Sequence, residues 1–286
     1  MGLFRRLGAW RRYRRMSRAL TELDRQDRRG PARKPSIRRR RFLGRGELAF
    51  LVSIPVIAAV LYVLTQQFPA LLGPAPGPVL RDPAPMGTGP YAFMATTSGG
   101  QPVTYSSCRP INYVVNPAGM PAGGHQLIQD AITQVSQATG LQFVYQGEST
   151  EPPSEHREVH QPDRYSSSTA PVLIAWANTA EYPPISGDVE GVGGSAWIEP
   201  SRGPAFYVTG QVVLSRDGIS RMMDRPGGYE RARAVLLHEF GHLVGLAHVQ
   251  DPKELMTPVV SGLTGYGPGD RTGLARLGHG PCIRGR

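Results

Sequence analysis

Three histidines and one glycine constrain the fold of this chain more than any other feature of its sequence. His238 and His242 are four residues apart within segment 229–246, whose apolar residues recur at helical spacing. On a helix, that separation places both imidazoles on one face, about one turn apart. His248 cannot join them from a straight continuation of the helix, but Gly245 lets the chain turn, because glycine adopts the left-handed conformation at little cost. The pattern predicts a helix that ends near Gly245 and brings three imidazoles together.

The same segment predicts a catalytic metal site. Three neutral imidazoles bind Zn²⁺ and leave the fourth tetrahedral position open, as catalytic zinc sites do. Glu239 follows His238 directly and can take a proton from a zinc-bound water without binding the ion. Attack of the hydroxide on a carbonyl, with the proton passed by Glu239 to the leaving amine, is peptide hydrolysis. The alternative is a helix whose histidines bind nothing.

Residues 238–248 match the HExxHxxGxxH signature of the metzincin zinc peptidases, which have a methionine-containing turn beneath the metal. Met256 lies eight residues after His248, and the run Leu255-Met256-Thr257-Pro258 resembles the Leu-Met-x-Pro of the matrixins. The resemblance covers about residues 105–280. It implies that Met256 forms a hydrophobic floor under the zinc and that Pro258 helps to wall the substrate pocket.

The resemblance also implies where a substrate binds. The run Gly191-Val192-Gly193-Gly194 is similar to the Gly-x-Gly-Gly before the matrixin edge strand. By this likeness, residues 195–199 form the edge strand, and a polypeptide substrate pairs with it in extended form.

Other metal sites of the matrixins find no counterpart in the sequence. Animal matrixins hold a structural zinc through a histidine in the edge-strand region, whereas residues 195–200 contain none. His156 and His160 lie in a Pro-rich stretch, and we expect both to be solvated. Asp188 and Glu190 are calcium candidates by position alone, so Ca²⁺ is not supported by a readable site. One catalytic Zn²⁺ is therefore the expected cofactor.

The net positive charge is confined to the N-terminal part of the chain. Residues 1–46 hold 17 of the 32 basic residues and three acidic ones, a net charge of +14, whereas the remaining 240 residues carry −4. The domain-sized part is thus acidic, and we expect no nucleic-acid partner. Residues 48–64 are 17 uncharged residues, just long enough to span a bilayer, within a predicted transmembrane signal-anchor helix at 47–68. The alternative, a cleaved signal peptide, normally has a much shorter charged leader.

The positive-inside rule orients this anchor. It predicts a single-pass membrane protein with 1–46 as a cytoplasmic basic tail and the catalytic domain extracytoplasmic. Of the 32 basic residues only Lys34 and Lys253 are lysine, an arginine bias that favours a bacterial source. Residues 69–104 are rich in proline and glycine and predict a stalk, which leaves 105–286 as the metzincin-like domain. An extracytoplasmic location favours a disulfide between Cys108 and Cys282, although two unpaired thiols are the alternative.

The hydrophobic pattern and the resemblance together predict an α/β fold of the α+β zincin type. A strand, a crossover helix and a strand follow one another from residue 111 to 146, which implies a parallel pair. We expect a mixed, mostly parallel twisted sheet, a zinc-site helix, and a small C-terminal subdomain with the methionine turn and a final helix. Further strands are expected at 171–177 and 206–215, and the final helix at 270–278.

The combined expectation is a membrane-anchored zinc endopeptidase. Three other hypotheses stay open at this point. The domain is a zinc hydrolase of a non-peptide amide such as a cell-wall link, or a catalytically weak cell-surface binding module. In the third, the basic tail carries the main function by binding nucleic acid or lipid.

Overall fold

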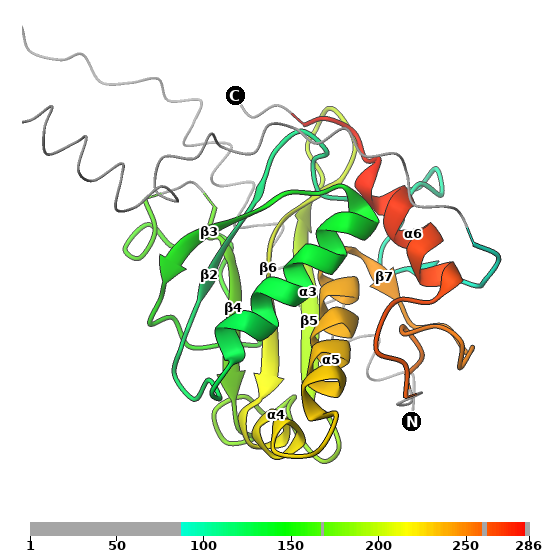
Figure 1. Ribbon diagram of the computed structural model, residues 1–286. Helices are drawn as coiled ribbons and strands as arrows, with labels where there is room; N and C mark the ends of the chain where they lie inside the picture. Colours follow the sequence, from blue (N-terminus) through cyan, green and yellow to red (C-terminus); the bar gives the residue numbers. More distant parts are fainter. Residues whose placement is uncertain (1–86, 167–168, 259–261, 284–286) are drawn as a thin grey trace, which may run out of the picture. The chain divides into compact units, whose positions relative to one another are not determined.

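The computed structural model describes residues 87–166, 169–258 and 262–283 (Figure 1). The predicted cytoplasmic tail, the transmembrane helix at 47–68 and the first half of the predicted stalk lie outside these residues. Within the described part, no helix is both long enough and apolar enough to cross a membrane.

A five-stranded sheet forms the centre of the domain, with the strand order β3-β2-β4-β6-β5. The first four of these pair in parallel, and β5 pairs antiparallel with β6 at one edge. The predicted mixed, mostly parallel sheet is therefore confirmed. The strands are β2 (Ile111–Val115), β3 (Phe143–Glu148), β4 (Val172–Ala177), β5 (Gly191–Ile198) and β6 (Phe206–Ser215).

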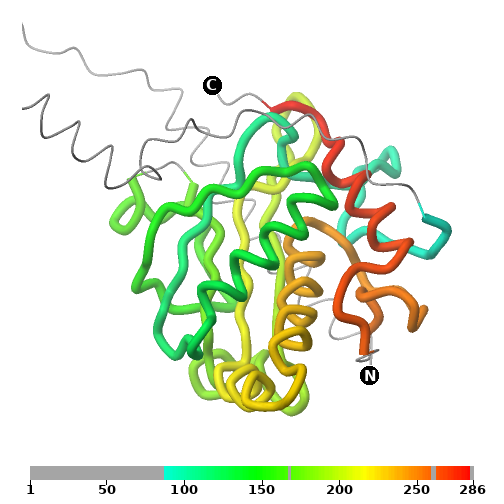
Figure 2. Tube along the Cα trace, in the orientation of Figure 1, coloured from blue at the N-terminus to red at the C-terminus, as the bar shows by residue number. Residues whose placement is uncertain are grey.

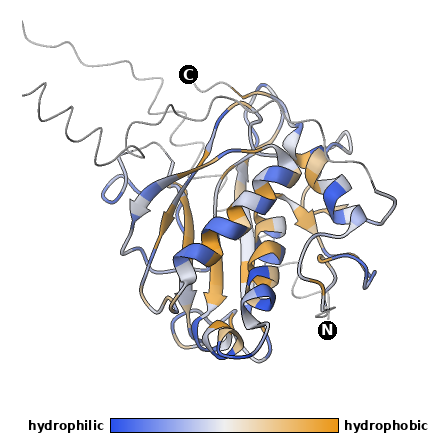
Figure 3. Ribbon diagram, viewed as in Figure 1, coloured by the Kyte–Doolittle hydropathy of each residue, from blue (hydrophilic) through white to orange (hydrophobic). Residues whose placement is uncertain are grey.

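Two helices, α3 (Gly124–Thr139) and α5 (Gly228–Val244), cover one face of this sheet (Figure 1). Side chains from α3, α5 and the strand face turned toward them form the main hydrophobic core. Figure 3 shows that apolar residues gather on the central strands and on the helix faces that meet them. The predicted crossover helix and zinc-site helix are thus both present.

Two further helices complete the domain. The final helix α6 (Pro268–Gly278) lies where the sequence predicted it. The short helix α4 (Arg216–Met223) was not predicted, although Ile219, Met222 and Met223 recur at helical spacing, because the helix is only about two turns long. It begins directly after β6, where the Ser215 hydroxyl accepts a hydrogen bond from the Gly218 N–H.

The folded domain begins earlier than the predicted boundary at residue 105. Strand β1 (Ala92–Phe93) pairs antiparallel with β7 (Leu246–Ala247). Val103 is also part of the core, with 1% of its surface exposed. The last third of the segment predicted as a stalk therefore packs on the domain. The few apolar residues of this segment make these contacts. The sequence did not predict them, because the segment as a whole is rich in proline and glycine.

Cys108 and Cys282 are joined by a disulfide that spans 174 residues of sequence. It links the segment before β2 to the chain after α6. Figure 2 traces the course of the chain between these two segments. Backbone and hydroxyl hydrogen bonds between Ser106, Ser107 and residues 281–283 accompany it. Of the two alternatives left open by the sequence, the structure contains the disulfide.

A buried ion pair holds the long connection between β3 and β4 against the sheet face opposite the helices. Arg157 donates to both carboxylate oxygens of Glu151, at 2.8 and 2.9 Å, and also to Gly210 O and Pro171 O. Burial alone would raise the pKa of Glu151. The charge of Arg157, together with hydrogen bonds from Arg157, Gln161 and Tyr165, lowers this pKa below its ordinary value.

Replacing Arg157 by alanine leaves the buried Glu151 carboxylate without its ion-pair partner. We expect Arg157→Ala to lower the free energy of unfolding by about 3–5 kcal/mol, as measured by urea unfolding. Arg216→Ala is the matched control, since its ion pairs with Glu181 and Asp217 are largely exposed and should contribute about 0–1 kcal/mol. Equal losses in the two variants would contradict this account.

Candidate metal centre

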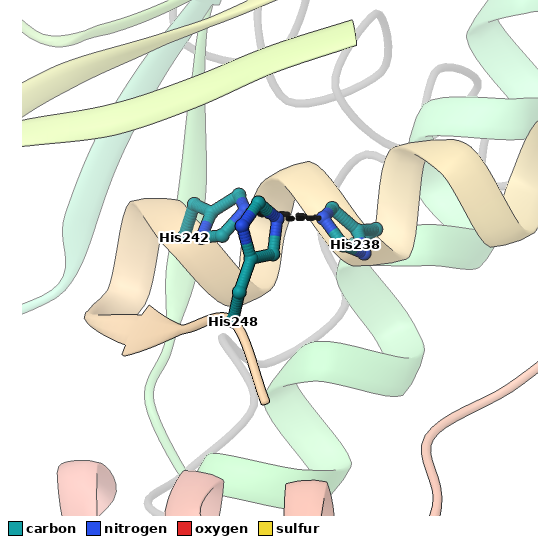
Figure 4. Close-up of side chains that lie close together, drawn as sticks. All are labelled: His238, His242 and His248. Atoms are coloured by element: carbon teal, nitrogen blue, oxygen red, sulfur yellow. Dashed lines mark hydrogen bonds between the residues drawn. The ribbon is translucent and has the colours of Figure 1, made fainter. Parts of the chain in front are cut away.

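The three histidines singled out by their spacing meet at one point (Figure 4). His238 and His242 project from neighbouring turns of α5, and His248 follows β7. The three Nε2 atoms lie 3.1 Å from one another in every pair. The helix ends where the sequence predicted, at Gly245, which has a φ of 121°. This conformation, unfavourable for other residues, lets the chain turn back and place the third ring opposite the first two.

The hydrogen bonds of two rings decide which nitrogens face inward. His238 Nδ1 donates to Leu255 O at 2.7 Å, and His242 Nδ1 donates to Leu246 O at 2.8 Å. A carbonyl only accepts, so these Nδ1 atoms carry the ring protons. Burial also lowers the pKa of all three histidines, that of His242 to about 3, so the rings are neutral. The Nε2 lone pairs of His238 and His242 therefore point at each other with no proton between them.

Such a donor set fits a zinc ion. Zinc–nitrogen bonds of about 2.0–2.1 Å in tetrahedral geometry put two nitrogens roughly 3.3 Å apart. The observed 3.1 Å separations are close to that value. Backbone carbonyls orient two of the rings from behind, which is the usual outer shell of a metal-binding histidine. His238, His242 and His248 would therefore hold the ion.

Glu239 follows the first of the three histidines on α5, and its side chain is turned toward the edge strand β5. Only 6% of its surface is exposed, and this burial raises the pKa of its carboxyl to about 8 in the absence of an ion. The backbone N–H of Gly193 donates a hydrogen bond to it, which acts in the opposite direction. A cation bound nearby would further favour the charged form. Glu239 is thus a carboxylate suited to exchange a proton near neutral pH.

The glycines of β5 let this strand approach α5 closely. A Cβ placed on Gly193 would lie 2.2 Å from the backbone oxygen of Glu239, and one on Gly191 would lie 2.6 Å from Glu239 Cγ. The edge strand begins at Gly191, not at residue 195 as the sequence suggested. At Gly191 and Gly193 only a residue without a side chain fits against the helix.

The methionine turn lies beneath the site. Met256 has 1% of its surface exposed, and its Sδ would be 2.5 Å from a Cβ on Gly241, between the first two histidines. Two buried carboxylates support this turn. Asp270 accepts from the backbone N–H of Leu255, and Glu254 accepts from the N–H groups of Gly269 and Asp270, both at 2.9 Å.

The sequence did not single out Glu254, because Asp251 and Lys253 beside it make it one of several charges in this turn. Pro258 is exposed, and its predicted role in the substrate pocket stays a prediction. Among the residues described, the three histidines are the only group with the geometry to hold a metal ion. Asp188 and Glu190 do not form such a group, and calcium remains unsupported. His156 is exposed, in agreement with its predicted solvation.

A family model and solved structures are similar to parts of this chain. The matrixin family model matches residues 166–268. Among solved structures, archaemetzincin from Methanopyrus kandleri is similar at 18% identity and a TM-score of 0.36, over 58% of this chain and 93% of that one. High choriolytic enzyme 1, a hatching-enzyme zinc protease from Oryzias latipes, is similar at 14% identity and a TM-score of 0.29, over 55% of each chain. No curated protein matches the sequence.

The class of protein follows from the three-histidine site and the matched segment: the chain is a zinc metallopeptidase. Its type is matrixin-like, since the match includes the zinc helix, the edge strand and the methionine turn. The resemblance seen in the sequence is confirmed.

The close approach of β5 to α5 can be tested at neighbouring glycines. We expect Gly193→Ala to lower peptidase activity by about tenfold or more, because the added Cβ must push the strand away from the helix backbone. Gly194→Ala is the control, since a Cβ there meets nothing within 4 Å. Rates on one peptide substrate, with zinc content measured in parallel, give the comparison. Similar rates for the two variants would show that the spacing is unimportant.

Proposed function

We propose that this protein is a membrane-anchored zinc endopeptidase in which Glu239 moves the proton. One observation carries the proposal: three imidazole nitrogens converge at the end of α5, and the residue directly after the first histidine is a buried carboxylate that packs against the edge strand. A purely structural metal site has no use for that carboxylate.

The chain's own residues supply binding and proton transfer. A zinc ion held by the three histidines would act as a Lewis acid toward the peptide carbonyl and lower the pKa of water. Glu239 takes the proton from that water and delivers it to the nitrogen of the leaving amine. Its raised pKa suits both halves of this exchange, because the group must accept and release a proton in one turnover.

The edge strand supports an endopeptidase that acts on extended polypeptides. β5 is the last strand of the sheet, so its outer edge has no strand partner among the five. Its eight residues exceed what one peptide bond needs, and Glu239 contacts it at Gly191 and Gly193. A substrate paired along β5 therefore continues on one side of the site well beyond the bond that is cut.

The membrane anchor is supported by the sequence and by the disulfide. The uncharged run ends at residue 64, and the described domain begins at residue 87. The residues between them span at most roughly 75 Å when fully extended, so an anchored domain works close to the bilayer. A disulfide also persists best outside the cytoplasm.

The catalytic role of Glu239 predicts a separation between cleavage and metal binding. We expect Glu239→Gln to reduce cleavage of an unfolded protein substrate by at least about a hundredfold while one zinc per chain is retained. Chelation should abolish wild-type cleavage, and added zinc should restore it. The control is Glu148→Gln, because Glu148 is an exposed carboxylate on β3.

If the wild-type protein binds one zinc yet cleaves no polypeptide, the endopeptidase proposal fails. Cleavage of cell-wall fragments in its place would identify a non-peptide amide as the substrate.

The anchor can be tested in the full-length chain. Two arginines in the middle of the uncharged run, Val56→Arg with Ala59→Arg, should move the protein from the membrane to the soluble fraction, because each costs about 2.5–3.5 kcal/mol at the centre of a bilayer. Fractionation and immunoblotting give the readout. Retention of this variant in the membrane would contradict the proposed span.

A further inference from the structure

A partly buried hydroxyl joins the edge strand to the zinc helix. Ser195, on β5, donates its Oγ proton to the backbone oxygen of Leu243 at 2.6 Å. Leu243 lies in the last turn of α5, where carbonyls lack a donor from within the helix. It also follows His242 directly. Ser195 therefore supplies the missing hydrogen bond at the end of the helix that presents the second metal ligand.

A second hydroxyl holds Ser195 in this orientation. Tyr105 Oη lies 2.7 Å from Ser195 Oγ. Because Ser195 gives its own proton to Leu243, the Tyr105 hydroxyl must be the donor of this bond. Burial raises the pKa of Tyr105 well above its ordinary value, so the phenol keeps its proton. The adjacent residue, Thr104, accepts the Tyr207 N–H at 2.9 Å, which fixes this segment to β6.

The neighbouring strand leaves space for these two hydroxyls. Gly210 on β6 is the register partner of Ser195. A Cβ on Gly210 would lie 2.6 Å from Ser195 Oγ and 2.6 Å from Leu243 Cδ1. No larger residue fits there without displacing the hydrogen-bonded chain. The position of Ser195 thus depends on four separate segments: 103–105, β5, β6 and α5.

The contacts of β5 with α5 occur at matched intervals. Gly193 meets Glu239, and two residues later Ser195 meets Leu243, one helical turn further on. Two residues of strand advance about 6.8 Å and four residues of helix about 6.0 Å, so the two elements run together. The glycine contact limits how close the strand comes. The hydrogen bond from Ser195 to Leu243 is directional, so it fixes the position of β5 along the axis of α5.

We propose that Ser195 and Tyr105 are positioning residues that fix the register of the edge strand along the zinc helix. The inference rests on the proposed function, in which substrate pairs with β5. Neither residue touches the metal site or the scissile bond. They determine where a substrate carbonyl lies relative to the three histidines and Glu239, since a substrate takes its register from the strand. β5 has one strand neighbour, so without this bond β6 and packing alone would hold it.

The test uses the full-length protein with Ser195→Ala, Tyr105→Phe and the double variant. Two peptides with the same scissile bond are compared: one long enough to pair with all of β5, and one reduced to the residues around the bond. Hydrogen exchange at the amides of residues 191–198 is measured independently of cleavage.

The controls remove hydroxyls that bond to α3 and not to β5. Thr139→Val deletes a buried hydroxyl that donates to Val135 O at the end of α3. Tyr229→Phe deletes a phenol that donates to Asp130. Both should lower stability without changing the relative use of the two peptides.

We expect Ser195→Ala to lower kcat/KM for the long peptide about tenfold more than for the short one, because only the long peptide uses the whole strand. Tyr105→Phe should act in the same direction and less strongly. The double variant should be no worse than Ser195→Ala, because both changes break one chain of hydrogen bonds. Exchange in β5 should become faster in these variants and stay unchanged in the controls.

An unchanged ratio of the two peptides together with unchanged exchange in β5 would overturn the inference while leaving the peptidase function intact. If the wild type cleaves neither peptide, the proposed function fails. The exchange data then decide the inference alone, since faster exchange in Ser195→Ala supports it and unchanged exchange refutes it.

Discussion

Imidazole lone pairs that face one another without protons between them are the interaction on which the rest of the structure depends. Two of the rings are oriented by backbone carbonyls, and these come from different places. Leu255 belongs to the methionine turn, and Leu246 to β7. The segments on both sides of His248 must therefore be held still for the three nitrogens to converge. Much of the C-terminal half of the domain serves that requirement.

The support beneath the metal centre is made by charge as well as by packing. Glu254 and Asp270 are each 1% exposed, and backbone N–H groups at the start of α6 bind both carboxylates. Helix N-termini favour negative charge because their N–H groups have no partner within the helix. The final helix is therefore attached to the methionine turn through its first residues. Leu255 connects this support to the metal centre. Its N–H donates a hydrogen bond to Asp270, and its carbonyl accepts one from His238 Nδ1.

The sequence predicted the metal ligands because their arrangement is local. Spacing along one helix and a glycine that ends it were sufficient, and β2, β4 and β6 followed from short apolar runs. The features that it missed depend on distant parts of the chain. Ser195 and Tyr105 are 90 residues apart, and Glu254 binds groups 15 and 16 residues away. The periodicity of apolar residues along one helix or strand gives no information about contacts between residues so far apart in the sequence. β1 was missed for a related reason, since two residues form a strand only when β7 is present beside them.

The pairing of β1 with β7 limits where the chain can be cut without harming the enzyme. Ala92 pairs with Ala247, the residue before His248, and Met94 N–H donates to Gly245 O at 2.8 Å. The incoming chain is thus bonded to the segment that carries the third ligand. A break upstream of residue 87 would leave this pairing whole. A break between β1 and Cys108 would leave the N-terminal piece held only by noncovalent contacts with α6 and with the segment around β7, and its loss would remove a brace from the metal centre. Any processing that frees an active domain must therefore act on the N-terminal side of β1.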